Sequence, residues 1–328
     1  MPHTDTATPA SPPLPVLRGD ETFYIVLNTG SGKHSGSEVQ ESISEVLNAA
    51  GRDFKLLQVE GGAGLEAAAK EAVALARANR GVVVAAGGDG TLNAVSNVVL
   101  GTGLPFAILP QGTFNYFGRT YGISQDTETA TRCLLDAVIE PVQVGMLNDK
   151  VFLVNASLGL YPTLLEDREA YKQRYGRSRW VALWSAVVTL FRAHRQLSVS
   201  LDFEGTTRQL RTQTIVVGNN ALQLEHIGVH EEVELQRDHL VAMTAKPLST
   251  LALYGLVARG LLSRMGEADH LISFGFKQMT VRLGPARRRI KVAMDGEIFW
   301  LRAPLTFRVP ETRLPLLVPR DNSQRERA

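Results

Sequence analysis

The chain is poor in cysteine, in excess charge of either sign and in long hydrophobic runs. Its one cysteine, Cys133, excludes an intramolecular disulfide and any metal site built from several cysteines, as expected for a reducing compartment. A net charge of +2 over 328 residues argues against a dedicated nucleic-acid-binding protein, so no nucleic acid is expected as a partner. No apolar run reaches the ~20 residues that a membrane-spanning helix requires. We therefore expect a soluble or peripheral protein of the cytoplasm.

The composition is otherwise that of an ordinary globular protein. Hydrophobic residues make up 44% of the chain, enough to bury a core without disulfides or a structural metal. Its length, set against about 100–200 residues per domain, predicts two domains. The first 20 residues are rich in proline and lack the apolar segment of a signal peptide, so residues 1–20 are predicted to form a disordered tail.

Two kinds of hydrophobic pattern divide the remaining residues. Within 21–140, short apolar runs such as "TFYIVL" (22–27) and "GVVVAA" (81–86) alternate with helical patterns, which predicts an α/β domain around a parallel sheet. Residues 141–309 hold short alternating segments bounded by turns, a pattern typical of an antiparallel β-sandwich. The predicted fold class is therefore α/β plus all-β.

Glycine-rich turns follow three strands of the predicted parallel sheet. They read "NTGSGKHSG" (28–36), "GGDGT" (87–91) and "PQGTFN" (110–115). Ligands of such sheets gather outside the carboxyl ends of the strands, and glycine lets backbone N–H groups approach phosphate oxygens. One such turn is more often a plain connection between strand and helix, but three on one sheet edge favour a phosphate site.

The second turn carries an aspartate, Asp89, among its glycines. A carboxylate beside several phosphate charges costs free energy unless a divalent cation lies between them. The turn therefore predicts Mg²⁺ with a nucleoside triphosphate more than a dinucleotide. Neither a Walker A motif nor GxGxxG is present.

These motifs resemble those of the diacylglycerol kinase catalytic family, which includes bacterial lipid kinases, diacylglycerol kinases, sphingosine kinases and ceramide kinases. "NTGSG", "GGDGTLN" and "PQGTFNYFGR" occur in the family's order, and "MDGE" (294–297) follows near the C-terminus. The resemblance runs from about residue 22 to residue 318. It implies ATP in a cleft between an α/β nucleotide-binding domain and a β-sandwich, a lipid hydroxyl as acceptor, and a C-terminal strand at 310–318 that returns to the first domain.

The resemblance also implies roles for single residues. Asp295 is the suggested general base, and Asp89, Asp295 and Glu297 form the catalytic set, with Asp89 and Glu297 as Mg²⁺ ligands. The residues that match the nucleotide-binding loops are Asn28, Ser31 and Gly32 in the first, Gly87, Gly88, Gly90 and Thr91 in the second, and Gly112, Thr113 and Asn115 in the third. From spacing alone, "MDGE" is equally well a hairpin turn, because Asp-Gly is a common hairpin signal.

The sequence departs from the family pattern at several positions. Thr29 stands where the first loop usually has proline, which predicts a small loss of rigidity. Tyr116 and Ala94 stand where many members have carboxylates, so the remaining acidic residues must carry more of the metal binding. Only Asp238 is left of an acidic turn that holds a structural Mg²⁺ in some members.

Three other segments are candidates for binding. His226 and His230 lack the HExxH order and lie in a strand-rich region, where residues four apart do not converge, so a zinc site is disfavoured there. The basic run "ARRRIKV" (286–292) suits a phosphate or anionic lipid, although a charge run is more often a solvated strand edge. Residues 168–195 combine basic side chains with aromatic ones on one helical face, which suits an interfacial helix and equally a core helix.

The sequence as a whole predicts an ATP-dependent lipid kinase that uses Mg²⁺. Its expected partners are a lipid substrate and the anionic inner face of the membrane, where it binds peripherally, and a homodimer is left open. The alternatives are a soluble-metabolite kinase of the NAD-kinase type and a non-catalytic lipid- or nucleotide-binding protein. The acceptor lipid is not predicted, because its selection depends on the shape of an apolar pocket.

Overall fold

The computed structural model describes residues 14–30, 35–112, 114–160, 162, 197–203, 205–219, 238–245, 271–284, 288–321 and 325. The chain falls into two compact units. The first unit is drawn from Met1–Thr113, Tyr121–Val142 and Pro310–Arg327, and the second from Phe114–Thr120 and Gln143–Val309.

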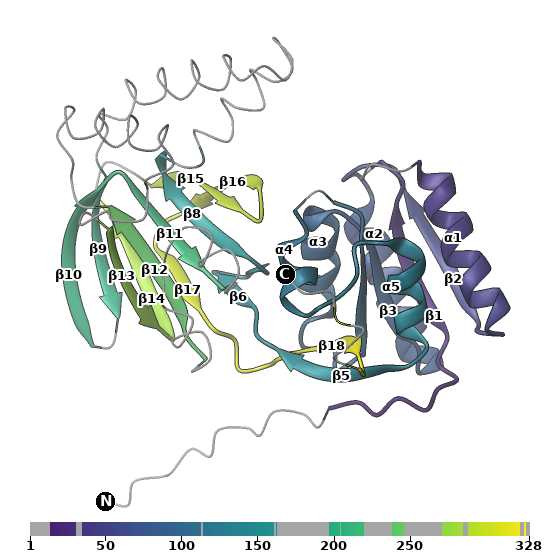
Figure 1. Cartoon of the computed structure of the whole chain (residues 1–328). Coiled ribbons are helices and arrows are strands. Elements are labelled where there is room, and N and C mark those ends of the chain that lie inside the picture. The colour runs from purple at the N-terminus through teal and green to yellow at the C-terminus, as the bar shows by residue number, and fades with distance from the viewer. Residues whose placement is uncertain are drawn as a thin grey trace, which may run out of the picture. The chain divides into compact units, whose positions relative to one another are not determined.

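The first unit is built on a six-stranded sheet in the order β2-β1-β3-β4-β18-β5 (Figure 1). All neighbouring pairs are parallel except β18 with β5. Strands β1 and β3 are buried along their whole length, which explains why their sequences are continuously apolar. The strands are β1 (Phe23–Asn28), β2 (Phe54–Val59), β3 (Val82–Gly87), β4 (Phe106–Pro110), β5 (Ala137–Val142) and β18 (Leu314–Pro319).

Helices accompany this sheet, with α1 packed beside α5 and α2 beside α3 (Figure 1). A capping box between Ser35 and Glu38 starts α1, and the Asp126 side chain caps α5 by accepting a hydrogen bond from the Thr129 N–H. The helices are α1 (Gly36–Ala49), α2 (Leu65–Asn79), α3 (Asp89–Val99) and α5 (Thr127–Leu134), while the short α4 (Tyr116–Thr120) belongs to the second unit.

The two ends of the chain both contribute to the first unit. β18 lies between β4 and β5, with Leu316 beside Phe106 on one side and all six of its residues buried. Residues 14–20, part of the expected tail, are described by the structure, and the backbone N–H groups of Arg18 and Gly19 donate to the Glu21 carboxylate.

The second unit is an antiparallel β-sandwich, as the sequence predicted. Its sheets run β10-β9-β14-β17-β6-β7 and β13-β12-β11-β8-β15-β16, with every neighbouring pair antiparallel. The strands of the first sheet are β6 (Gly145–Leu147), β7 (Lys150–Phe152), β9 (Leu197–Phe203), β10 (Thr206–Thr212), β14 (Gln278–Leu283) and β17 (Leu305–Arg308). Those of the second are β8 (Asn155–Gly159), β11 (Thr214–Gly218), β12 (Leu240–Ala245), β13 (Leu271–Phe276), β15 (Arg289–Met294) and β16 (Glu297–Arg302).

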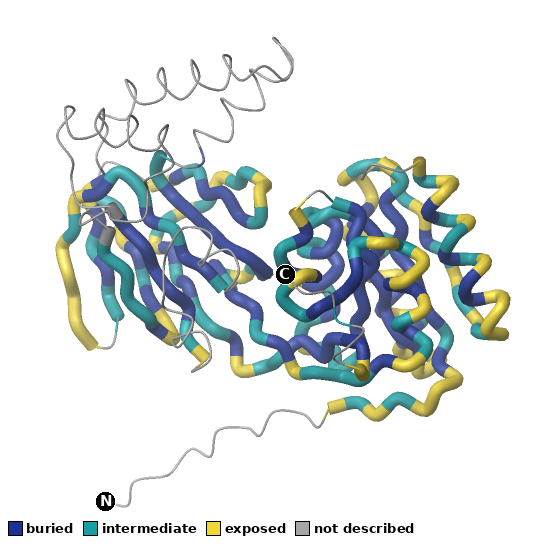
Figure 2. The backbone as a smooth tube through the Cα atoms, viewed as in Figure 1, coloured by how far each residue is buried: buried dark blue, intermediate teal, exposed yellow. Residues whose placement is uncertain are grey.

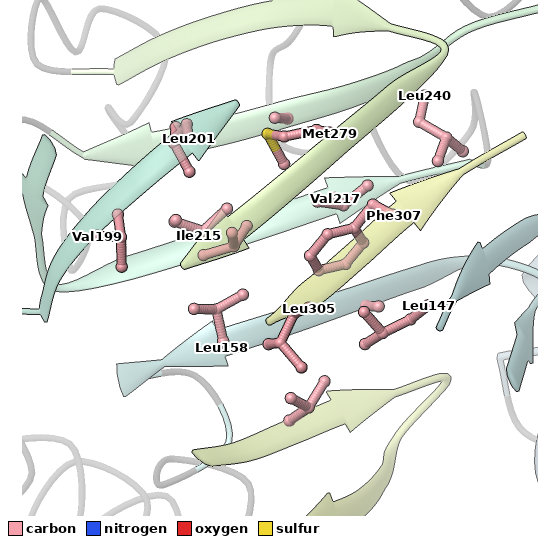
Figure 3. Packing of buried hydrophobic residues seen from close by; sticks show 14 of the residues in the cluster. Leu147, Leu158, Val199, Leu201, Ile215, Val217, Leu240, Met279, Leu305 and Phe307 are labelled. Carbon is pink, nitrogen blue, oxygen red and sulfur yellow. The ribbon is translucent and has the colours of Figure 1, made fainter. Parts of the chain in front are cut away.

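The core of the sandwich lies between these two sheets (Figure 3). Alternate residues of each strand point inward, as the pleat of a β-strand requires. Leu201 of β9, Met279 of β14 and Phe307 of β17 come from one sheet, and they pack in one cluster with Leu158 of β8 and Ile215 of β11 from the other. Figure 2 shows buried residues along most strands and exposed residues along the outer sides of the helices. Within the described residues, no helix is long and apolar enough to cross a membrane.

Candidate active site

The three glycine-rich turns begin at the carboxyl ends of β1, β3 and β4, which are neighbours in the sheet. Because these strands are parallel, their last residues, Asn28, Gly87 and Pro110, lie at the same edge. The Gln111 N–H donates to the Gly87 carbonyl across this edge, with the two atoms 2.8 Å apart. The first unit therefore brings the starts of all three turns together.

Asn28 ties the turns to one another through its side chain. Its Nδ2 donates to Thr91 Oγ1 at 3.0 Å, and its Oδ1 accepts from the N–H groups of Gly30 at 3.1 Å and Gly61 at 3.0 Å. Both Asn28 and Thr91 are buried, and their polar atoms are hydrogen-bonded to each other. These bonds hold the turns in position relative to one another.

Asp89 is the first residue of α3, and Gly88 is its N-cap. The first N–H groups of a helix have no partner within the helix and carry its positive dipole end, which stabilises both a carboxylate and a bound phosphate. Asp89 and Gly90 are partly exposed, in contrast to the buried Thr91 that follows them. The N-terminus of α3 thus presents backbone donors and one carboxylate at the sheet edge.

The two glycines of the second turn differ in what surrounds them. A Cβ placed on Gly87 would lie 2.5 Å from Thr91 Oγ1, so packing alone requires glycine there. A Cβ on Gly88 would meet only the Cα of Gly112, at 3.7 Å, and the φ of Gly88 is −78°. Gly88 therefore leaves open the space between the second and third turns.

Thr29 makes contacts that proline could not make. Its N–H donates to the Val59 carbonyl at 2.9 Å, and its Oγ1 donates to the same oxygen at 3.2 Å. These two hydrogen bonds hold the first loop to the end of β2. The sequence had instead predicted that Thr29 makes this loop less rigid. Ser31 and Gly32 of this loop, and Thr113 of the third, lie outside the described residues.

The third motif crosses from one unit to the other, with Gly112 in the first and Asn115 in the second. Asn115 is buried and has a φ of +47°, a conformation that asparagine tolerates better than most residues. Its carbonyl accepts a hydrogen bond from the Arg119 N–H at 3.0 Å. Phe114, half exposed, stacks on Tyr116 with ring centres 5.8 Å apart.

Asp295 occupies the tight turn between β15 and β16. Its φ is +47° and that of Gly296 is +89°, as a two-residue hairpin requires. The carboxylate accepts three backbone N–H bonds from the loop between β7 and β8 and from the first residue of β8. Oδ2 accepts from Leu153 at 2.7 Å, and Oδ1 accepts from Val154 at 2.9 Å and Asn155 at 3.0 Å. "MDGE" is thus a hairpin turn, and the same aspartate anchors a neighbouring loop in the sandwich.

The residues named as magnesium ligands lie in different units, Asp89 in the first and Glu297, exposed at the start of β16, in the second. Across the described ranges, no three His, Cys, Asp or Glu side chains cluster as a metal site. Mg²⁺ commonly takes only one or two carboxylates together with substrate phosphate oxygens. A single carboxylate beside an open glycine cradle therefore fits a magnesium nucleotide.

Two residues of this edge were missed from the sequence. Gly61 belongs to a fourth glycine-rich turn, "GGAG" (61–64), which follows β2, and its N–H donates to Asn28. Gln111 is buried, and its side-chain amide exchanges hydrogen bonds with the Thr127 hydroxyl at the start of α5. The glycines of the fourth turn were a usable signal. Gln111 lies inside the third turn, but nothing in the sequence predicts its hydrogen bonds with Thr127.

Several other sequence candidates, His226, His230 and residues 168–195, lie outside the described residues. Cys133 is partly buried on α5, and this burial raises the pKa of its thiol.

Comparisons with known proteins agree with the motifs. Residues 22–147 match the model of the diacylglycerol kinase catalytic domain. A putative lipid kinase of Staphylococcus epidermidis is 32% identical over 136 residues, which are 40% of this chain and 43% of that protein. A diacylglycerol kinase of Mycobacterium tuberculosis is 27% identical over 198 residues, 58% of this chain and 62% of that protein. The chain thus matches about half of the length of these relatives.

The fold has solved counterparts. A putative diacylglycerol kinase from Bacillus anthracis superposes with a TM-score of 0.67, at 18% identity, over 93% of this chain and 98% of that chain. At this identity the likeness concerns the fold alone. Taken together, the motifs and the relatives agree with the match of residues 22–147 to the diacylglycerol kinase catalytic domain, which this part of the chain resembles.

Proposed function

We propose that this protein is an ATP-dependent lipid kinase that transfers the γ-phosphoryl group to a lipid hydroxyl. The observation that carries the proposal is the meeting of glycine-rich turns at one sheet edge, with Asp89 at the N-terminus of α3 beside them. Backbone N–H donors and a helix N-terminus bind phosphate oxygens, while the carboxylate suits the cation that accompanies them.

Each part of this edge has its own task. The N–H groups of Gly88 and Gly90 and the start of α3 would bind the phosphates, and Asp89 would hold Mg²⁺. The chemistry that such an ion would supply is neutralisation of the charge that develops on the transferring phosphoryl group. Asn28 keeps the turns in register through its three hydrogen bonds, so it acts by positioning them.

Asp295 is the proposed base for the acceptor hydroxyl, and Glu297 the second carboxylate of the metal site. Hydrogen bonds to a carboxylate favour its charged form and lower its affinity for a proton, so what they supply to a base is an ionised group and not added basicity. The N–H groups of Leu153, Val154 and Asn155 also fix the orientation of the Asp295 carboxylate. Phosphoryl transfer depends mainly on such positioning.

The proposed site of action is the inner face of the cytoplasmic membrane. A lipid acceptor lies in a bilayer, so the protein would bind an anionic membrane surface peripherally.

Radiolabelled ATP offered with a panel of lipids and with NAD distinguishes the candidate functions. The panel contains diacylglycerol, a sphingoid base and a polyprenol. Label in a lipid product that depends on Mg²⁺ supports the proposal. Label in NAD alone would show a soluble-metabolite kinase, and nucleotide binding without any labelled product would show a binding protein.

A further inference from the structure

The hairpin β15–β16 forms one edge of its sheet and has two unlike faces. Ile290 and Val292 of β15 belong to the sandwich core, and Phe299 of β16 packs against it. Because side chains alternate along a strand, the residues between them point away from the core. This outer face of the hairpin consists of Arg289 and Lys291 on β15 and of Trp300 and Arg302 on β16.

The outer face of the hairpin combines an exposed indole with several cations. Trp300 is 56% exposed, and Lys291 Nζ lies 5.3 Å from the centre of its ring. Arg289 and Arg302 are both exposed, and in the part of the chain that the structure describes they form no ion pair. Arg288, also exposed, extends the cationic end by one residue.

Fold stability does not account for this arrangement. Arg289 and Arg302 are direct cross-strand partners, and like charges opposite each other destabilise a sheet. A large exposed aromatic side chain on an edge strand likewise gains little from folding. Both features become favourable when an anionic, partly apolar surface covers the outer face of the hairpin.

We infer that the outer face of the hairpin docks on the surface of an anionic lipid bilayer. Indole rings settle at the headgroup level of membranes, and each Lys or Arg near an anionic leaflet raises affinity on the order of fivefold. The same hairpin carries Asp295 in its turn, roughly 16 Å along the strand from Trp300 at about 3.3 Å per residue. Docking would therefore bring the proposed base within about that distance of the surface in which a lipid hydroxyl lies.

The test is co-sedimentation of the full chain with vesicles, without ATP. Phosphatidylcholine vesicles with and without phosphatidylglycerol are compared at low and high salt. The wild type is expected to bind only the anionic vesicles and to lose binding as salt rises. Arg302→Glu should weaken this binding at least tenfold, because an attraction is replaced by a repulsion. Trp300→Ala should weaken this binding about tenfold. This loss should be similar at low and high salt, because burial of the indole depends less on salt than charge attraction does.

Arg211→Glu is the matched control, since Arg211 is an exposed arginine on β10, an edge strand of the other sheet in the same unit. It should bind as the wild type does, and thermal unfolding should show all three variants folded. Should Trp300→Ala fail to fold, Arg289→Glu takes its place.

Docking rests on the proposed function for its purpose, yet vesicle binding is measured without catalysis, so the two can fail separately. Equal binding of Arg302→Glu and wild type overturns the inference. So does an equal loss in Arg211→Glu, or salt-sensitive binding to double-stranded DNA with none to anionic vesicles.

Discussion

At the scale of single residues, the site depends on side chains that hold backbone in position. Asn28 and Asp295 are both predicted from sequence as groups that act on ligands, yet each accepts backbone N–H bonds from other segments. A polar side chain with several backbone partners is costly to replace, because the donors left behind lose their acceptor. Substitutions at such residues therefore affect folding as well as activity.

Asp295→Asn tests this double role. The amide nitrogen of the new side chain cannot accept from one of the three N–H groups at 153–155, so we expect a stability loss of about 1–3 kcal/mol. Loss of the base should lower kcat by ~10²–10⁴ with little change in nucleotide affinity. Urea unfolding and steady-state kinetics on the same preparation measure both effects. Unchanged stability would show that the three hydrogen bonds are not needed to hold the loop.

At the scale of elements, the two glycines of the turn between β3 and α3 have different roles, Gly87 in packing and Gly88 in ligand binding. Gly87→Ala forces a Cβ to within 2.5 Å of Thr91 Oγ1, so we expect a clear fall in the unfolding midpoint. Gly88→Ala places its Cβ 3.7 Å from the nearest atom and should fold as the wild type does. It should nevertheless weaken binding of ATP, because the methyl group enters the space in front of the α3 N–H groups.

Thermal unfolding with and without magnesium ATP compares the two alanine variants directly. The expected pattern is a low midpoint for Gly87→Ala and a wild-type midpoint with little ligand-induced increase for Gly88→Ala. If magnesium ATP raised the unfolding midpoint of Gly88→Ala as much as that of the wild type, the phosphates would bind elsewhere.

The α/β pattern, the sandwich and the family were predictable from sequence because each depends on local patterns. Continuous apolar runs mark β1 and β3, and alternating segments mark the sandwich strands. The glycines of "GGDGT" mark a turn in which the backbone comes too close to a neighbouring group for a side chain to fit, as at Gly87 beside Thr91. The partners of Asn28 were not predictable, because Gly61 and Thr91 come near it only once three strands lie side by side.

At the scale of the whole molecule, the chain leaves the first unit and comes back to it. β18 is an interior strand of the first sheet, although it follows the whole sandwich in sequence. The first unit therefore cannot complete its sheet until the C-terminal segment is made. Long-range strand pairing of this kind carries a high entropic cost in folding.

A chain truncated after residue 309 tests the contribution of β18. Removal of β18 deprives β4 and β5 of their common neighbour and exposes apolar side chains that β18 covers in the intact sheet. We expect loss of cooperative unfolding in the first unit and loss of ATP binding. Calorimetry of the truncated and full-length chains would show one transition fewer, whereas an unchanged profile would mean that the sheet stands without β18.

The central claim is that the edge built by β1, β3 and β4 binds magnesium ATP for transfer to a lipid hydroxyl. The most direct measurement is the rate of ³²P transfer from ATP to diacylglycerol in neutral detergent micelles as Mg²⁺ is titrated, for the wild type and Asp89→Asn. We expect Mg²⁺-dependent labelled lipid from the wild type and a severe loss in Asp89→Asn at limiting Mg²⁺, with both proteins equally folded. Wild-type turnover by Asp89→Asn at limiting Mg²⁺ would contradict it.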